Sequence, residues 1–131
     1  MIDRSVKGAV ALWLWAALVM PASAQDMAGD PARGGELFRA RCFACHSPDT
    51  DRVGPRLAGV FGREAGTVPG YAYSPALAGA GIVWDRRSLD SWLAGPRAFV
   101  PGARMPLAVS NAADRLDLIA YLAALTLNTV R

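Results

Sequence analysis

Hydrophobic residues form one uninterrupted run near the start of the chain, from Gly8 to Met20. This run of 13 residues is shorter than the roughly 18–20 apolar residues that a bilayer-spanning helix needs. Two basic residues precede it, Pro21 breaks it, and Ala22-Ser23-Ala24 follows with the small-residue pattern of a cleavage site. We therefore interpret residues 1–24 as a secretory signal peptide that is cleaved after Ala24. The alternative is a retained membrane anchor.

The pattern after this segment predicts a short flexible lead-in over residues 25–29 and then one domain over residues 30–131 with three main helices. Asp30 and Pro31 predict the first helix start, because aspartate caps free N–H groups and proline fits the first turn. This helix runs to about Cys42. A glycine in its middle costs about 1 kcal/mol relative to alanine, which favours close approach by another helix.

The other two main helices lie in the C-terminal half. Asp85 predicts the cap of a helix over residues 86–94, and Pro96 ends it. Asn111 and Asp114 have the spacing of a capping box and predict a helix that runs to about 125. The apolar faces of these two helices consist of Leu89, Trp92 and Leu93, and of Leu118, Tyr121, Leu122 and Leu125.

Two loops separate these helices. Residues 47–82 are rich in glycine and proline and have no long periodic run, so they predict an ordered loop with a turn of helix at 74–78. A loop of this length is unusual in a compact domain, but it is reasonable if it wraps a prosthetic group that supplies the missing core. A second loop over residues 96–110 carries Met105. The expected fold class is all-α.

The motif Cys42-Phe-Ala-Cys45-His46 is the attachment signature of a c-type haem. Each thiol adds across one haem vinyl group, and the imidazole of the next residue binds the iron. These are the only two cysteines and the only histidine of the chain. A structural zinc site usually takes four such ligands, a redox dithiol of the thioredoxin type expects a βαβ context, and a disulfide here would close a very small loop. Haem is therefore the favoured interpretation, with these three as alternatives.

A second axial ligand for the iron is expected among the methionines. Cleavage after Ala24 leaves Met27 in the lead-in and Met105 in the second loop, between Pro101 and Pro106. A thioether is a soft, neutral ligand that favours Fe(II) and raises the reduction potential. We predict His46 and Met105 as the axial ligands. The alternative role of Met105 is to fill a gap in the core.

The net charge of the chain is too small for a strongly basic protein. The full chain has a formal charge of +3. Removal of residues 1–24 leaves 12 Arg, no Lys and 10 acidic residues, which gives +2. Two ionised haem propionates would bring the total to about zero. We therefore expect no nucleic-acid partner.

Together these motifs resemble class I c-type cytochromes, specifically the mitochondrial cytochrome c type and its bacterial periplasmic relatives, over about residues 29–126. The motifs that carry the resemblance are Gly34, Phe38, Cys42–His46, Gly54-Pro55, Gly59–Arg63, Pro69–Tyr73, Gly81–Trp84, Pro101–Met105 and Leu118–Leu122. The resemblance implies a class I cytochrome c fold, with three main helices and short helical turns around one haem c that is covalently bound through Cys42 and Cys45.

The resemblance also implies roles for individual residues. The carbonyl of Pro55 should accept the outward N–H of His46 and fix its tautomer. Arg63, Tyr73 and Trp84 should hold the inner haem propionate, because a buried carboxylate needs such partners to stay ionised.

Two further groups of residues are placed by the resemblance. Gly34 and Phe38 should contact the last helix near Leu118 and Tyr121. Positions that family members often fill with lysine around the exposed haem edge are here Arg41, Arg52, Arg97 and Arg104.

The chain departs from the family at three positions near the methionine. The usual asparagine, tyrosine and threonine, which form a network with a buried water, are replaced by Leu77, Trp92 and Ala103. We predict a drier methionine side without this complete network.

The function that the resemblance implies is one-electron transfer rather than enzyme catalysis. We expect a soluble, periplasmic and monomeric carrier without a stable membrane anchor, which docks transiently at its haem edge with membrane or periplasmic redox complexes. Three alternatives remain open. They are a haem-relay subunit of a larger membrane oxidoreductase, a cytochrome anchored by its uncleaved signal, and a peroxidase-like enzyme in which Met105 does not bind the iron.

The absence of lysine leads to a first prediction. In the family, alkaline pH lets a lysine displace the methionine ligand, but the predicted mature chain contains no lysine. The alkaline form should therefore be hydroxide-bound, or use the N-terminal amine if that amine is free. Magnetic resonance of the alkaline form of N-terminally blocked protein checks this, and an amine ligand in that sample would contradict it.

Overall fold

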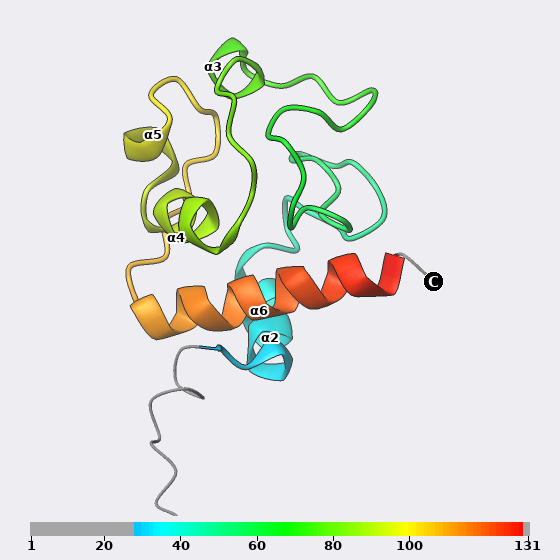
Figure 1. Ribbon diagram of the computed structural model, residues 1–131, viewed down its shortest axis with the longest axis vertical. Coiled ribbons are helices and arrows are strands. Elements are labelled where there is room, and N and C mark those ends of the chain that lie inside the picture. The colour runs from blue at the N-terminus through cyan, green and yellow to red at the C-terminus, as the bar shows by residue number, and fades with distance from the viewer. Residues whose placement is uncertain (1–27, 130–131) are drawn as a thin grey trace, which may run out of the picture.

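The structure is a computed structural model that describes residues 28–129. The predicted signal peptide, Met27 and most of the lead-in lie outside the described residues. The helices are α2 (Pro31–Arg41), α3 (Pro75–Ala78), α4 (Arg86–Ala94), α5 (Pro96–Phe99) and α6 (Ala112–Thr129), as Figure 1 shows. Pairing of extended backbone within the described part is limited to one isolated bridge between Glu64 and Val83. The predicted all-α class is confirmed.

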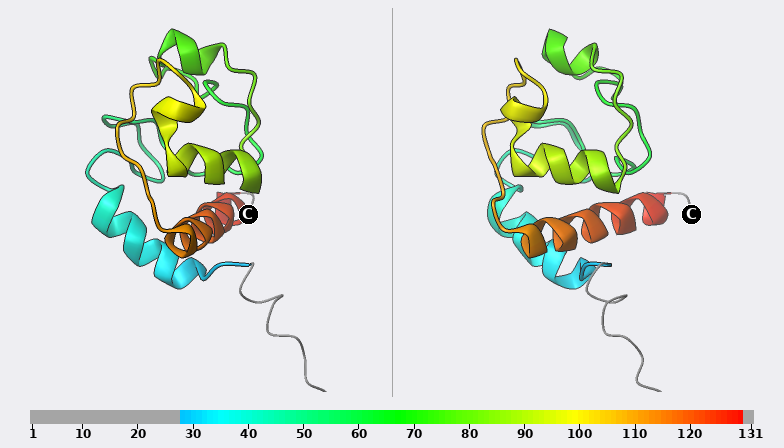
Figure 2. Two further views of the ribbon diagram at one scale, coloured as in Figure 1. Left: turned by 90° about the vertical axis from the view of Figure 1, so that its left-hand side faces the viewer. Right: turned by 60° about the vertical axis from the view of Figure 1, so that its left-hand side comes forward.

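Helices α2 and α6 pack against each other on one side of the molecule, with α4 and α5 on the opposite side of α6 (Figures 1 and 2). Gly34 permits this approach, because a Cβ built at this position would lie 1.9 Å from the carbonyl oxygen of Asp117. One turn further along α2, the rings of Phe38 and Tyr121 lie 5.2 Å apart between their centroids. Phe38 and Leu118 are buried in the same apolar core. The predicted contact between the first and last helices is confirmed.

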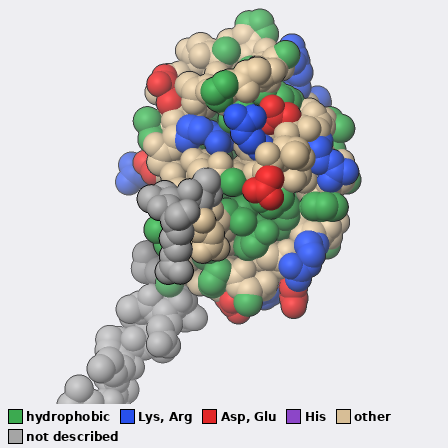
Figure 3. Space-filling model, turned by 90° about the vertical axis from the view of Figure 1, so that its right-hand side faces the viewer, with side chains coloured by type: hydrophobic (Ala, Val, Ile, Leu, Met, Phe, Trp, Pro, Cys, Tyr) green, Lys and Arg blue, Asp and Glu red, His purple; other side chains and the backbone are tan. Residues whose placement is uncertain are grey.

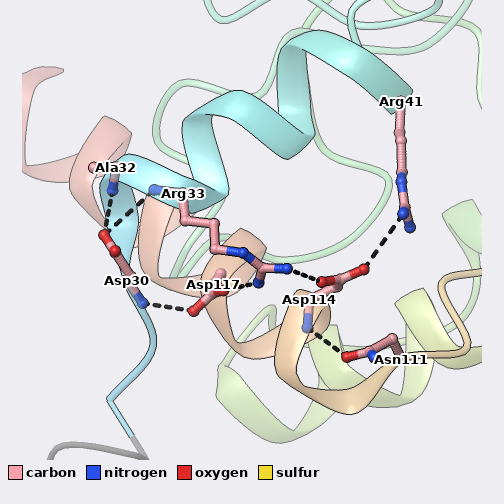
Figure 4. Close-up of polar contacts among 7 residues, drawn as sticks. All are labelled: Asp30, Ala32, Arg33, Arg41, Asn111, Asp114 and Asp117. Carbon is pink, nitrogen blue, oxygen red and sulfur yellow. Dashed lines mark hydrogen bonds and ion pairs between the residues drawn. The ribbon is translucent and has the colours of Figure 1, made fainter.

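Polar side chains fasten the same two helices together (Figure 4). The guanidinium of Arg33 binds the carboxylates of Asp114 and Asp117. The backbone N–H of Asp30 donates to Asp117 at 2.7 Å, and Arg41 reaches Asp114 at 3.4 Å. These contacts hold both ends of α2 against α6.

The helix starts follow the predicted caps. Asp30 accepts from the N–H of Ala32 at 2.8 Å, and Asp85 forms a complete capping box with Ser88. Asn111 accepts from the N–H of Asp114 at 3.0 Å. The Asp114 carboxylate forms ion pairs with Arg33 and Arg41.

Two helix boundaries differ from the prediction. The loop predicted from residue 96 onward was wrong at its start, because Pro96 begins the short helix α5 rather than a loop. Proline fits the first turn of a helix, so one residue can end α4 and begin the next helix. Helix α6 continues to Thr129 rather than ending near Leu125. Thr126 supports this extension, because its hydroxyl donates to the Leu122 carbonyl and accepts from the N–H of Phe61.

The long loop over residues 47–82 is ordered and contains the predicted turn of helix, α3. Ser74 caps α3 by accepting from the N–H of Leu77 at 3.1 Å. No helix among residues 28–129 combines the length and apolar character that crossing a bilayer requires. The loop, α4 and α6 instead surround a central apolar space, which is described below.

Replacement of Gly34 by alanine should test the contact between α2 and α6. The added Cβ would overlap the Asp117 carbonyl, so the helices must move apart, and the free energy of unfolding should fall by about 2–3 kcal/mol. Denaturant unfolding of the haem-loaded protein measures this change.

Gly35→Ala is the matched control in the same helix. Its Cβ would meet side-chain atoms rather than backbone, namely ring atoms of Tyr121 at 3.2 and 3.3 Å and Nη1 of Arg39 at 3.7 Å. The free energy of unfolding should stay within about 1 kcal/mol of the original. Equal losses in the two variants would contradict the proposed role of Gly34.

Candidate haem site

The end of α2 forms the motif that carries both cysteines. The N–H of Cys42 still donates to the Phe38 carbonyl at 2.8 Å, as in a helix, and a tight turn follows. In this turn, the carbonyl of Cys42 accepts from the N–H groups of Cys45 at 3.0 Å and His46 at 2.8 Å. The two thiols and the imidazole therefore come from one short, hydrogen-bonded segment. All three line the same cavity.

His46 is held by the loop that follows it. Its Nδ1 lies 2.8 Å from the carbonyl oxygen of Pro55. A carbonyl only accepts, so Nδ1 carries the proton and Nε2 keeps its lone pair. Burial lowers the pKa of His46, although the bond to Pro55 opposes this shift. The ring is thus a neutral imidazole whose Nε2 is not engaged by Pro55, and its role as a metal ligand stays a prediction.

Gly54 makes room for this ring. A Cβ at this position would lie 2.2 Å from Cε1 of His46. The N–H of Gly54 donates to the Cys45 carbonyl at 2.8 Å, which fixes the loop directly against the haem motif. This glycine was part of the recognised motif, but no specific role was predicted for it. Its position next to Pro55 was the available signal.

The cavity has a volume of about 400 Å³ and is lined mainly by apolar side chains from α2, the long loop, α4 and α6. Met105 lies on the same lining, so the structure brings together the thioether, the imidazole and both thiols. The apolar part of the lining includes Phe38, Leu57, Val60, Leu77, Leu89, Trp92, Leu93, Leu118 and Leu122. The members from the long loop were not predicted individually, because that loop has no periodic pattern.

Arg63, Tyr73 and Trp84 also line the cavity, as expected. The guanidinium of Arg63 donates to the carbonyls of Arg56 and Ala58, both at 3.2 Å. Burial lowers the pKa of Arg63 and raises the pKa of the Tyr73 phenol. A cation and a protonated phenol within an apolar cavity suit a carboxylate.

The four arginines expected around the haem edge divide into two pairs. Arg41 and Arg104 line the cavity, whereas Arg52 and Arg97 are not part of its lining. Arg52 instead lies over the ring of Phe43, 4.9 Å from its centroid, and donates to the carbonyl of the same residue.

The three positions that depart from the family pattern are placed differently in the structure. Leu77 and Trp92 line the cavity, and Ala103 is buried with 5% of its surface exposed. The ring of Trp92 packs against Trp84 with 5.3 Å between centroids. The absence of a water network on this side stays a prediction.

The donor set of this cavity fits haem better than the alternatives. Within residues 28–129, no group of three or more Cys, His, Asp and Glu side chains could hold a metal ion together, which disfavours zinc. Cys42 and Cys45 are not joined in a disulfide. A large apolar cavity with two thiols, an imidazole and a thioether on its lining is what a covalently bound haem requires.

Comparison with known proteins agrees with this geometry. The family model described as cytochrome c matches residues 31–126. The chain belongs to the cytochrome c family. It is 48% identical to a cytochrome c of Euglena viridis, over 74% of this chain and 98% of that protein.

Bacterial relatives are also similar. A cytochrome c2 of Rhodomicrobium vannielii is 43% identical, over 82% of this chain and 88% of that protein. The structure of cytochrome cH from Methylobacterium extorquens is similar with a TM-score of 0.71 and 44% identity, over 73% of this chain and 99% of that chain.

Membership in this family establishes the cofactor and the general activity. This cytochrome carries one haem c, attached through Cys42 and Cys45, in the class I cytochrome c fold. Members of the family transfer electrons and are not enzymes.

Gly54→Ala should disturb the orientation of His46. The new Cβ would occupy the position of the imidazole, so the ring or the loop must move, and the yield of haem-loaded protein should fall severalfold. Gly95→Ala is the control, because its nearest new contact is an ordinary 3.5 Å to Ala98. Haem absorbance per milligram of purified protein measures the yield, and equal yields from both variants would disprove the steric role of Gly54.

Proposed function

We propose that this cytochrome is a diffusible, periplasmic one-electron carrier in which His46 and Met105 are the two axial ligands. The observation that supports the ligand pair is that an imidazole with its Nδ1 bonded to Pro55 and a thioether line the same apolar cavity as the two cysteines. When bound, the haem supplies the redox chemistry, because its iron alternates between the ferrous and ferric states.

The side chains of the cavity divide the remaining tasks. His46 would offer Nε2 to the iron, with its ring oriented by the bond between Nδ1 and the Pro55 carbonyl. Met105 would provide a neutral sulfur ligand that favours the reduced state. If both side chains bound the iron, no coordination position would be left for oxygen or a substrate. This argument supports a carrier over a peroxidase-like enzyme.

Arg63 and Tyr73 are proposed to hold a haem propionate together with Trp84. Arg63 is half-buried and already bonded to two backbone carbonyls, so its charge stays in place. The pKa of the Tyr73 phenol is raised by burial, so it remains an O–H donor at neutral pH. A carboxylate placed between these groups would stay ionised despite its burial.

Electron exchange requires that part of the cavity be close to the surface. Cys45 is exposed, whereas Cys42 is half-buried, so the Cys45 side of the cavity is proposed to meet redox partners. Figure 3 shows one face on which basic and acidic side chains are interspersed with apolar ones. On the Cys45 side, a small transient interface with membrane or periplasmic redox complexes is proposed.

Export to the periplasm rests on the sequence. Residues 1–24 have the apolar run and small-residue cleavage site of a signal peptide. We propose cleavage after Ala24, which would release the cytochrome from the membrane. The intact mass of protein from the periplasmic fraction tests this, because a retained signal segment would support the anchored alternative.

Replacement of Met105 by alanine tests the ligand assignment. Ferric Met105→Ala protein should lose the weak near-infrared band of an Fe(III)–sulfur bond and have a lower reduction potential, because a neutral ligand that favours Fe(II) is gone. Met27→Ala is the matched control and should keep both properties. Loss of the band in the Met27 variant alone would assign the ligand to Met27.

The same preparation separates the alternative functions. A carrier should purify as a monomer and should bind cyanide slowly at neutral pH. Co-purification with other redox subunits would favour a relay subunit. Fast cyanide binding by the unmodified protein would favour a peroxidase-like enzyme.

A further inference from the structure

The segment that carries Met105 has no regular secondary structure of its own. It spans residues 100–111, between α5 and α6. Its position therefore depends on side chains of neighbouring elements. We name residues 100–111 the methionine loop.

Arg115, in the first turns of α6, binds the C-terminal end of the methionine loop. Its Nη1 donates to the carbonyls of Val109 at 3.0 Å and Ser110 at 2.9 Å. Its Nε donates to Asp90 of α4 at 2.7 Å. The Arg115 side chain is only 13% exposed. One guanidinium thus joins α4, α6 and the loop.

Val109 is the residue of the methionine loop that is bonded to both α4 and α6. Only 1% of its surface is exposed, and its N–H donates to the Leu93 carbonyl of α4 at 2.7 Å. Both the N–H and the carbonyl of Val109 are therefore bonded. To open this end of the loop, the molecule must break these bonds and expose a buried side chain.

The N-terminal side of the loop is held differently. Val100 and Ala103 are buried, and the N–H of Ala103 donates to the Val100 carbonyl at 3.0 Å. The side-chain bonds on this side are exposed to solvent: Arg104 donates to the Ala72 carbonyl at 3.0 Å, and its own carbonyl accepts from Arg97 at 3.2 Å. The end held by Arg115 differs in having a part-buried side-chain hydrogen bond, the one to Val109.

Val109 is close to Met105 along the chain, so the bonds that hold Val109 also limit the movement of Met105. Val109 lies four positions after Met105, and a fully extended chain spans at most about 3.5 Å per residue. While Val109 stays in place, the Met105 backbone remains within about 14 Å of it. A sulfur that leaves its position can then return by a short local movement.

We propose that Arg115 is a positioning residue for Met105, and that it does so by clamping Val109 and Ser110 to α4 and α6. The proposal rests on the ligand assignment made above for Met105. Local opening of the methionine loop is what an external ligand must await before it can replace Met105. Arg115 therefore sets how well the cytochrome resists such replacement.

Arg115→Gln tests this proposal in the haem-loaded protein. Glutamine is chosen rather than lysine because lysine would add a possible iron ligand to a lysine-free domain. The measured quantity is the rate of cyanide binding to the ferric protein at neutral pH. Loss of the clamp should raise this rate by about tenfold or more, because each lost hydrogen bond makes opening easier.

Arg33→Gln is the matched control. It makes the same change in another arginine, which joins α2 to two aspartates of α6 without contacting the methionine loop. It should lower the global stability without raising the cyanide rate to the same extent. Equal acceleration in the two variants, after comparison of their unfolding free energies, would overturn the proposal.

Hydrogen exchange of the backbone amides provides a second measurement. Arg115→Gln should speed exchange over residues 103–109, and Arg33→Gln should not. Asp90→Asn, a milder change to the partner of Arg115, should act in the same direction with a smaller effect. It keeps the test valid if Arg115→Gln does not fold. Unchanged exchange in both Arg115→Gln and Asp90→Asn would overturn the clamp.

The two hypotheses fail in different ways. If the unmodified ferric protein lacks the Fe(III)–sulfur band, the assignment of Met105 as ligand is wrong. Hydrogen exchange still decides whether Arg115 holds the loop, because it does not depend on what binds the iron.

Discussion

The close contact of α2 with α6 is the constraint on which the rest of this cytochrome depends. At Gly34 there is no space for a side chain between the two backbones, and Phe38 and Tyr121 pack one turn further along α2. The end of α2 carries the cysteines, and the start of α6 carries Arg115, which binds the methionine loop. The contact between α2 and α6 therefore fixes the position of the cysteine motif and of the residue that binds the methionine loop.

The haem compensates for a core that the chain does not complete by itself. The long loop contains little regular secondary structure apart from α3, yet it is ordered and helps to enclose an apolar cavity of about 400 Å³. Apolar surface around such a cavity is stabilised when the space is filled. The cofactor is therefore part of the folded structure as well as the site of electron transfer. This explains why a segment rich in glycine and proline can be ordered here without forming long helices.

Local signals in the sequence predicted much of this arrangement, and long-range contacts supplied the rest. Asp30, Asp85 and Asn111 act through groups a few residues away, so their caps could be predicted. The cysteine motif is equally local. The bonds of Arg63 and the clamp by Arg115 were not predicted, because each depends on which loops and helices meet in space. Helix α5 was missed although Pro96, which fits the first turn of a helix, was a local signal for it. Nothing in the spacing of Arg115 and Val109 indicates their contact.

The replacement of lysine by arginine has a consequence for the surface. After Lys7 the chain contains no lysine, and Arg52 and Arg104 donate to backbone carbonyls of neighbouring loops. A guanidinium keeps its proton far above the pH at which an ammonium group loses it. The bonds of Arg52 and Arg104 to backbone carbonyls therefore hold these positive charges at defined positions on the surface. A partner that docks here meets planar, oriented guanidinium groups rather than freely moving ammonium groups.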